Sequence, residues 1–391
     1  TTRQLLHGST ILEVPASGGS GNVSNWSSTQ IFDINNDIDC LGDMYLEVAV
    51  DVPTFAGTGT HNYVFETQEI ASSITRVEFQ VGTQIWQTLE NQDIMALAAT
   101  EMSEGVYREF SNQASGRVLY DGSVINNGTF DSATGFTDST VAATQSKRAV
   151  YVPLKMFTKS IAPELQHFSE KSEGGYLMAA APNQQVKIKV YTSVTKTFGS
   201  HGQPTELNVR LFAKNIVMCN EEREQMKAMP MGIPKRIKTT QNANTNIGAH
   251  GASGAVQTID IDHFSLYASH LLITFPKTQY DKILGAELLL NSSSFSGELP
   301  TSLLEIISSS MNLYNNNYII EGEDADQFDT LVFPLASRAY SGSSVPLNRF
   351  DNIRLKIRHS VTSPAGATFN VTCVGETTAL YKGGAASLAM Y

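Results

Sequence analysis

The segment from Asp33 to Asp39 is the first place in this sequence where residue types and spacing could bind a cation. It reads Asp-Ile-Asn-Asn-Asp-Ile-Asp, and calcium loops also place oxygen ligands at alternate positions. Two positions break the pattern. Ile38 stands where a calcium loop has its turn glycine, and Met44 stands where it has a bidentate Glu. We therefore expect a polar loop that leads into a strand at Met44.

Other patterns that could carry chemistry are also incomplete. The glycines between Gly248 and Gly254 are not followed by Gly-Lys-Ser/Thr, so they predict a linker and not a phosphate loop. The eight histidines lack HExxH or comparable ligand spacing, and no Gly-x-Ser-x-Gly marks a nucleophile. One acidic run predicts a solvated loop, with a bound cation as the alternative: Glu321, Glu323, Asp324 and Asp326. The sequence thus predicts no catalytic residue, no metal ligand and no cofactor, and therefore no enzyme.

The composition favours a β-rich protein with a surface partly covered by neighbours. The chain has 391 residues, enough for two domains, and combines 41% hydrophobic with only 17% charged residues. Its formal net charge of −11 repels a phosphate backbone, so direct nucleic-acid binding is disfavoured. Local basic strand faces are the exceptions: Lys187 and Lys189, and Arg354, Lys356 and Arg358. Asn-x-Ser/Thr sequons, whose occupancy the sequence leaves open, occur at Asn22, Asn25, Asn127, Asn291 and Asn370.

The cysteines and the chain ends predict a reduced, intracellular, soluble protein. The three cysteines, Cys40, Cys219 and Cys373, are far apart and form no CxxC pair. No signal-peptide pattern opens the chain, and no apolar run reaches the roughly 18 residues of a membrane span. Thr1 fits an initiator Met removed before a small side chain, with a processed precursor as the alternative.

Short apolar alternations separated by Gly, Asn, Pro and Ser clusters predict many β-strands. Such strands begin near Met44, Val77, Val186, Leu207 and Ile259. Helical periodicity is confined to residues 87–102, 219–229 and, more weakly, 302–311, and in the second of these Asn220 could cap and Pro230 stops the helix. Long polar stretches at residues 111–147 and 291–300 predict loops that leave the ends of sandwiches.

The sequence Met231-Gly-Ile-Pro234 marks a domain boundary, because it follows a helix stop and leaves a set of strands on each side. We expect an all-β fold of two tandem sandwiches, without a convincing residue-level repeat between them. The expected parts are an N-terminal arm (1–25), a first domain (26–230), a second domain (231–382) and a C-terminal arm (383–391).

The stretch from Pro346 to Ser360 joins a polar turn to a strand. Ile353, Leu355 and Ile357 alternate with basic residues, which indicates a half-buried strand. In the lead-in, residues 348–352 read Asn-Arg-Phe-Asp-Asn, and we expect these Asn and Asp side chains to bind nearby backbone N–H groups.

An ordered set of motifs surrounds this stretch. Phe333-Pro-Leu is followed by Ser341-Gly-Ser and then by residues 348–352. Earlier in the chain, residues 74–86 read as strand, Gly turn and strand before a helix, Tyr151-Val-Pro-Leu opens a strand, and Asn220-Glu-Glu-Arg begins a helix. Together these resemble the double jelly-roll major capsid proteins of large eukaryotic DNA viruses (the nucleocytoplasmic large DNA viruses) and their smaller relatives. The serine that the family has before Arg349 is absent.

The resemblance implies two eight-stranded jelly-roll sandwiches with a few short helices. It also implies a structural role: a homotrimeric, pseudo-hexagonal capsomer that tiles the icosahedral shell of a double-stranded DNA virus, assembled in the host cell and present in the virion. Implied partners are further copies of the chain, neighbouring capsomers, minor capsid and penton proteins and, because the family often encloses lipid, an internal membrane. This chain is shorter than typical members, which implies shorter tower loops and leaves the virus group open.

Two other readings stay open at this point. One is a minor capsid or spike protein with the same fold. The other is a carbohydrate-binding jelly-roll module, which needs aromatic side chains clustered in a groove, whereas this chain has only Trp26 and Trp86, and Trp86 is expected in a core.

Overall fold

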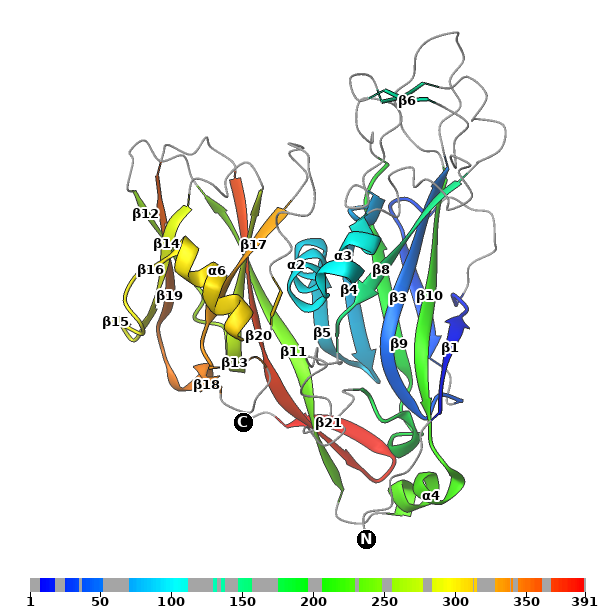
Figure 1. Ribbon diagram of the computed structural model, residues 1–391. Helices are drawn as coiled ribbons and strands as arrows, with labels where there is room; N and C mark the ends of the chain where they lie inside the picture. The colour runs from blue at the N-terminus through cyan, green and yellow to red at the C-terminus, as the bar shows by residue number, and fades with distance from the viewer. Residues whose placement is uncertain are drawn as a thin grey trace.

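The computed structural model places two β-sandwich lobes side by side (Figure 1). It describes residues 8–17, 25–34, 37–51, 70–111, 129–131, 135–137, 147–156, 175–195, 206–228, 232–247, 255–276, 283–311, 313–314, 328–337, 339, 344–360 and 367–389. The linker glycines at 248–254, the acidic run at 321–326 and the sequons at Asn22 and Asn127 lie outside these residues.

The first lobe consists of two antiparallel four-stranded sheets. One sheet has the order β1-β10-β3-β8, from Gly8–Val14, Leu207–Val217, Cys40–Asp51 and Lys147–Leu154. The other has the order β2-β9-β4-β5, from Thr29–Ile34, Val186–Thr192, Ile74–Val81 and Gln84–Glu90. The short hairpin of β6 (Thr129–Asp131) and β7 (Gly135–Thr137) lies in the long polar stretch between β5 and β8, most of which is outside the described residues.

The second lobe has two corresponding sheets. The first runs β11-β20-β13-β17, from Ile233–Ile247, Ala367–Lys382, Tyr267–Pro276 and Phe328–Pro334, with β18 (Val345–Pro346) beside β13 and β21 (Ala385–Ala389) beside β20. The second runs β12-β19-β14-β15, from Val256–Asp260, Ile353–His359, Ile283–Leu290 and Ser293–Ser294, with β16 (Leu299–Pro300) also on β14.

Both lobes have the same topology. With the main strands of each lobe numbered in chain order, and β15 and β16 sharing the fifth place in the second lobe, the sheet orders are 1-8-3-6 and 2-7-4-5 in both. This is the order of a jelly roll, in which strands distant in sequence lie side by side in two packed sheets. The predicted pair of jelly-roll sandwiches is confirmed, and the repeat exists in topology although the sequence does not display it.

A helix follows the fifth strand of each lobe. In the first lobe β5 leads into α2 (Asn91–Glu101) and α3 (Glu104–Ser111), and in the second β16 leads into α6 (Thr301–Ser310). The predicted helix at 87–102 begins later than expected, because residues 84–90 pair with β4 and Glu90 forms a capping box with Asp93. No described helix is long and apolar enough to cross a membrane.

The remaining helices are short. α4 (Asn220–Ala228) follows the first lobe, and its first backbone bond runs from Arg223 N–H to the carbonyl of Cys219, so Asn220 lies inside the helix and not at its cap. Two 3-10 turns, η3 (Met178–Ala180) and η4 (Leu347–Arg349), precede β9 and β19.

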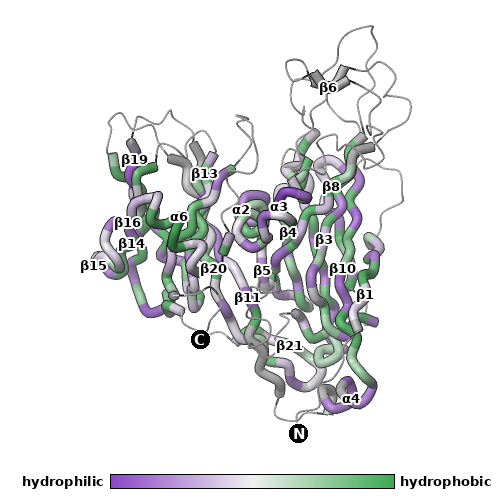
Figure 2. Tube along the Cα trace, viewed as in Figure 1, coloured by the Kyte–Doolittle hydropathy of each residue, from purple (hydrophilic) through white to green (hydrophobic). Residues whose placement is uncertain are grey.

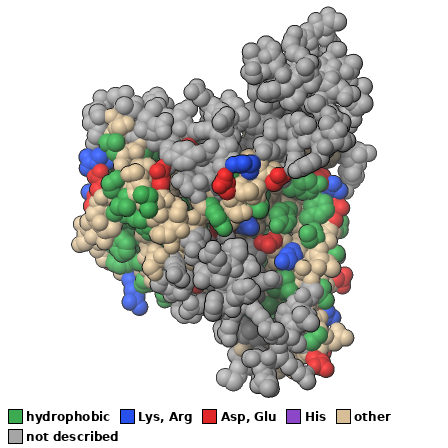
Figure 3. Space-filling view, in the orientation of Figure 1, with side chains coloured by type: hydrophobic (Ala, Val, Ile, Leu, Met, Phe, Trp, Pro, Cys, Tyr) green, Lys and Arg blue, Asp and Glu red, His purple; other side chains and the backbone are tan. Residues whose placement is uncertain are grey.

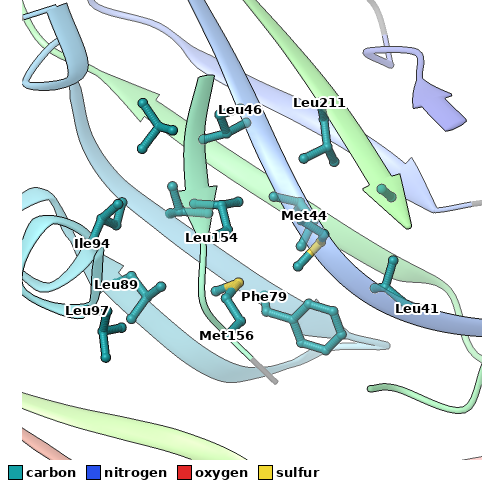
Figure 4. Close-up of a cluster of buried hydrophobic side chains, with 14 of the residues drawn as sticks. Leu41, Met44, Leu46, Phe79, Leu89, Ile94, Leu97, Leu154, Met156 and Leu211 are labelled. Carbon is teal, nitrogen blue, oxygen red and sulfur yellow. The ribbon is translucent and has the colours of Figure 1, made fainter. Parts of the chain in front are cut away.

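Alternation with a period of two builds each core, and Figure 2 shows it as alternating green and purple along the strands. Met44, Leu46 and Val48 of β3 are buried, and their inward faces meet Phe79 and Leu89 from the opposite sheet (Figure 4). In the second lobe Leu271, Ile273 and Phe275 of β13 pack with the buried face of β19.

Three segments expected to lie outside the sandwiches belong to their sheets. Gly8–Val14, from the expected N-terminal arm, is edge strand β1, paired with β10. Ala385–Ala389, from the expected C-terminal arm, is β21, which forms a hairpin with β20. Residues 291–300, expected as a loop excursion, supply β15 and β16. Their sequences lack clear alternation because an edge strand buries little of its surface.

Candidate functional site: the interface between the two lobes

A ladder of polar side chains on β11 joins the second lobe to the first. Alternate residues of the strand, Lys238, Thr240, Asn242 and Asn244, face the first lobe. Lys238 donates to Glu101, Asn242 Nδ2 donates to Asp93 Oδ2 over 2.9 Å, and Asn244 donates to Glu90. Thr240 accepts a bond of 2.9 Å from Gln87 Nε2. The four first-lobe partners all lie on β5, α2 or the junction between them. One face of β11 therefore contacts one face of the β5–α2 segment.

Asp93 is the centre of this ladder. Its side chain is fully buried and accepts from Asn370 Nδ2 at 2.6 Å, from the Thr372 hydroxyl, from Asn242 and from the backbone N–H of Glu90 at 2.8 Å. Burial raises the pKa of Asp93, and these hydrogen bonds oppose the rise. Because the donors come from both lobes, Asp93 caps its own helix and fixes β11 and β20 against it.

The same contacts determine whether the glycosylation sequon at Asn370 is accessible. Asn370 and Thr372 are its first and third residues; both are fully buried on β20, and both donate to Asp93. A glycan on Asn370 would have to occupy the space filled by α2. This sequon is therefore closed in the folded chain.

Lys238 and Glu101 form an ion pair with both side chains completely buried. Burial lowers the pKa of Lys238, while the negative charge of Glu101 opposes the shift. Separating two buried charges leaves each without compensation, so the pair constrains how the lobes can sit. Apolar contact also joins the lobes, since Leu272, Val332 and Val374 of the second lobe belong to the core cluster of the first.

The hairpin of β20 and β21 makes a second connection between the lobes. The Tyr381 ring packs edge-on against Tyr176 with centroids 5.4 Å apart, and its hydroxyl accepts from Leu177 N–H at 3.1 Å. Ala386 N–H donates to Gln184 Oε1 at 2.6 Å, and Asn183 N–H donates to the Gly384 carbonyl at 3.0 Å. The β20–β21 hairpin of the second lobe thus binds the turn that precedes β9 in the first lobe.

His270 of β13 also lies at the interface between the lobes, and it is the strand partner of Val374 on β20. It is fully buried, and its Nδ1 lies 2.7 Å from the Ser269 hydroxyl. Burial, together with the nearby charge of Lys238, lowers the pKa of His270 to about 3. The folded chain therefore holds this imidazole neutral.

Two carboxylates of the calcium-like segment, Asp33 and Asp39, accept hydrogen bonds from protein donors. Asp39 accepts from Arg223 Nη2 at 2.7 Å and from Met218 N–H at 2.9 Å, which ties α4 to the first lobe. Asp33 accepts from Gln185 Nε2 at 3.1 Å. Among the described residues, no group of three or more His, Cys, Asp or Glu is placed to hold a metal.

The turn at residues 348–352 is fixed from elsewhere in the chain. The amide oxygen of Asn291 accepts from the N–H groups of Asp351 and Asn352 at 3.0 and 3.2 Å, and Asp262 accepts from Ile353 N–H. The sequence did not indicate these acceptors, which are distant along the chain from the turn. The acceptors come from distant loops because the strand must enter between β12 and β14.

The basic faces are paired with acidic neighbours. On β19, Arg354 lies 2.9 Å from Asp260, Lys356 lies 3.6 Å from Glu287, and Arg358 forms a short ion pair with Glu298. Lys187 lies 3.7 Å from Asp33. The strip on β19 therefore presents little uncompensated positive charge to a phosphate backbone.

Two of the three cysteines and Trp86 are buried. None of the three cysteines is in a disulfide: Cys40 and Cys373 are buried in different lobes, and Cys219 is exposed. Trp86 is buried against Phe79 and Tyr176, as expected for a core residue, so it offers no sugar-stacking surface.

Removing one partner of the buried ion pair should be far worse than removing both. For Lys238→Met we expect a loss of about 3–5 kcal/mol in the free energy of unfolding, because the buried carboxylate of Glu101 loses the ammonium group that it pairs with. Lys238→Met combined with Glu101→Leu should recover most of this loss. Denaturant titration measures both, with Arg354→Met, which breaks an exposed pair, as the control that changes little. Equal losses in single and double variants would contradict the role assigned to the pair.

His270 should make the protein less stable on acidification. Its folded pKa of about 3 lies below the ordinary 6.5, so between these values the unfolded chain binds more protons and stability falls as the pH falls. From pH 7 to pH 5 the contribution is about 2 kcal/mol. In His270→Gln it should vanish, and the difference between the two proteins removes the contribution of Asp93, which both share. Parallel pH–stability curves would show that His270 is not held neutral.

Comparison with known proteins finds similarity at the level of structure. No protein-family model matches the sequence, and no curated protein matches it. VP54 of PBCV-1, from a crystal structure fitted into a reconstruction of the virophage Sputnik, superposes with a TM-score of 0.69 at 12% identity. That alignment covers 100% of this chain and 98% of VP54.

Two further structures agree. A chain of the PBCV-1 virus capsid model has a TM-score of 0.68 at 13% identity and covers 100% of this chain and 98% of its own length. The Faustovirus major capsid protein has a TM-score of 0.61 at 11% identity, with 95% of this chain and 90% of that chain covered. At identities this low, the superpositions establish a shared fold and no more. This chain has the double jelly-roll fold found in these viral capsid proteins, as its motifs predicted.

Proposed function

We propose that this chain is a structural major capsid protein that forms homotrimeric, pseudo-hexagonal capsomers in the icosahedral shell of a double-stranded DNA virus. The observation that carries the proposal is the presence of two jelly rolls of identical strand order in one chain, aligned over their whole length with capsid proteins. The polar interface supports it, because it fixes the two lobes in one relative orientation.

The physical logic of the proposal is one of tiling. Three copies of a two-lobed chain place six similar lobes around a threefold axis, which gives a nearly hexagonal outline. Contacts between lobes then suffice for assembly, and no catalytic group is needed. The paired basic strips and the net charge of −11 fit a protein whose partners are other protein surfaces.

The partners follow from that role. They are two further copies within the capsomer, neighbouring capsomers, minor capsid and penton proteins at special positions, and an internal membrane where the virus has one. The protein would be assembled in the host cell and reside in the virion.

The solution mass tests the proposal. Light scattering on a gel-filtration column should give about three times the 42.5 kDa chain mass, because each chain supplies two of six lobes. The mass should hold across a range of salt and protein concentrations. A monomer or dimer that persists at every concentration would contradict the capsomer and favour a minor capsid protein of the same fold.

A further inference from the structure

The two lobes use equivalent helices differently. α2 and α6 both follow the fifth strand of their lobe, and both precede the sixth. From Asp93 to Glu101 every residue of α2 is buried, because the helix lies between its own lobe and the second one. On α6 only Leu304 and Ser308 are buried. One face of α6 therefore packs on its own lobe and Ile307 is partly covered, whereas Leu303 and Ile306 are exposed.

Matching the helices from their first residues shows which face is uncovered. Ile94 and Ala98 of α2 correspond to Leu304 and Ser308 of α6, and all four side chains are buried. The third residue of α2 is Asp93, which contacts the second lobe, and the third residue of α6 is Leu303, which is 39% exposed. The sixth residues are Ala96, fully buried, and Ile306, 69% exposed. Where α2 meets another lobe, α6 presents two large apolar side chains to solvent.

The sheet of the second lobe on which α2 packs also has an equivalent in the first lobe, with aromatic side chains on its outer face. α2 packs on the outer face of the sheet β11-β20-β13-β17. The corresponding sheet of the first lobe is β1-β10-β3-β8. On its outer face Tyr151 of β8 is 44% exposed and lies with Phe212 of β10 in a ring pair whose centroids are 6.1 Å apart. This aromatic pair is what an apolar helix face would contact.

The charges beside the aromatic pair are already compensated. Arg210 makes a forked contact to Glu47, with bonds of 2.6 and 2.7 Å from Nη2, and its guanidinium lies 5.4 Å from the Phe212 ring centroid. Glu13 of β1 lies 3.6 Å from the same guanidinium. An apolar helix could therefore cover this face without leaving an unpaired charge in contact with it.

We propose that α6 of one copy packs on the outer face of β1-β10-β3-β8 of a second copy, in the way that α2 packs on β11-β20-β13-β17 within one chain. Leu303 and Ile306 would contact Tyr151 and Phe212. Hydrophobic side chains gather over α6 and over the β3, β8 and β10 region on the same side of the molecule (Figure 3). The contact is heterologous, since it joins different surfaces of two copies, and it can close into a ring. It rests on the proposed function and names the surfaces that would form the capsomer.

The first experiment compares solution masses of the wild-type chain and of Ile306→Glu over a concentration series. A carboxylate at this position would be buried against aromatic rings, so the concentration at which the trimer half-dissociates should rise at least tenfold. Val194→Glu is the matched control, because Val194 is 71% exposed and lies after β9, away from both surfaces. It should leave the trimer intact. Near-UV circular dichroism and thermal unfolding of the monomer show that Ile306→Glu still folds.

The second experiment tests the pairing of the two surfaces directly. In a Cys219→Ser background, one batch carries Ile306→Cys and another carries Tyr151→Cys. Oxidation of the mixed batches should give disulfide-linked dimers, and oxidation of either batch alone should not, because each surface then lacks its partner.

The outcomes separate this inference from the proposed function. If the wild type is a trimer and Ile306→Glu remains one, or the mixed cysteine variants do not cross-link, the surfaces are wrong while the capsomer stands. If the wild type is monomeric at every concentration, the capsomer and this interface fail together. Loss of the trimer in Ile306→Glu but not in Val194→Glu, with cross-linking only in the mixture, supports the interface.

Discussion

The structure depends on the polar ladder between β11 and the β5–α2 segment. Sandwiches joined only by apolar contact could slide or rotate at small cost, because such contact is not directional. Here Glu101 and Asp93 are buried and need donors at fixed places, which Lys238 and the side chains beside it on β11 and β20 supply. Any other register would leave a buried charge unpaired. The ladder thus selects one arrangement of the two lobes, as the proposed role as a capsid tile requires.

Because the topology is repeated, each lobe contains both kinds of surface that meet in the contact between the lobes. In each lobe the helix after the fifth strand lies on one side, and a sheet made of the first, eighth, third and sixth strands lies on another. Within the chain, the helix of the first lobe covers the sheet of the second. The helix of the second lobe and the sheet of the first have no such contact within the chain, and they are the surfaces that we propose for contact between copies. The two kinds of surface differ in chemistry. The contact between the lobes contains buried polar side chains, whereas α6 of the second lobe and the outer sheet of the first carry the exposed side chains Ile306 and Tyr151.

The sequence predicted most of the fold where period-two alternation was strong. Met44 to Val50 and Val186 to Val190 lie in β3 and β9 as expected; burial alternates along β9, whereas in β3 Glu47 and Ala49 are buried as well. Edge strands such as β1 escaped prediction, because they bury too little to need alternation. The motif resemblance gave the double jelly roll correctly, since ordered motifs report on topology even when the lobes no longer share sequence.

The candidate site was much harder to predict. β11 is polar along most of its length and carries no apolar alternation, although Lys238 is fully buried. Its meaning depends on Glu101 and Asp93, which are distant in sequence and belong to the other lobe. Asn370-Val-Thr372 likewise reads as a glycosylation site, whereas both polar side chains serve Asp93. Pairwise polar contacts between lobes leave no spacing rule in one sequence, but a long, largely polar run such as residues 238–246 is the signal that could have indicated them.

Electron-microscopy class averages of the purified protein test the central claim most directly. Viewed along the symmetry axis, a capsomer of three two-lobed chains should show six similar densities in a closed ring with threefold symmetry. Particles with only two densities, or pairs related by a twofold axis, would contradict the claim that this double jelly roll is a capsid tile.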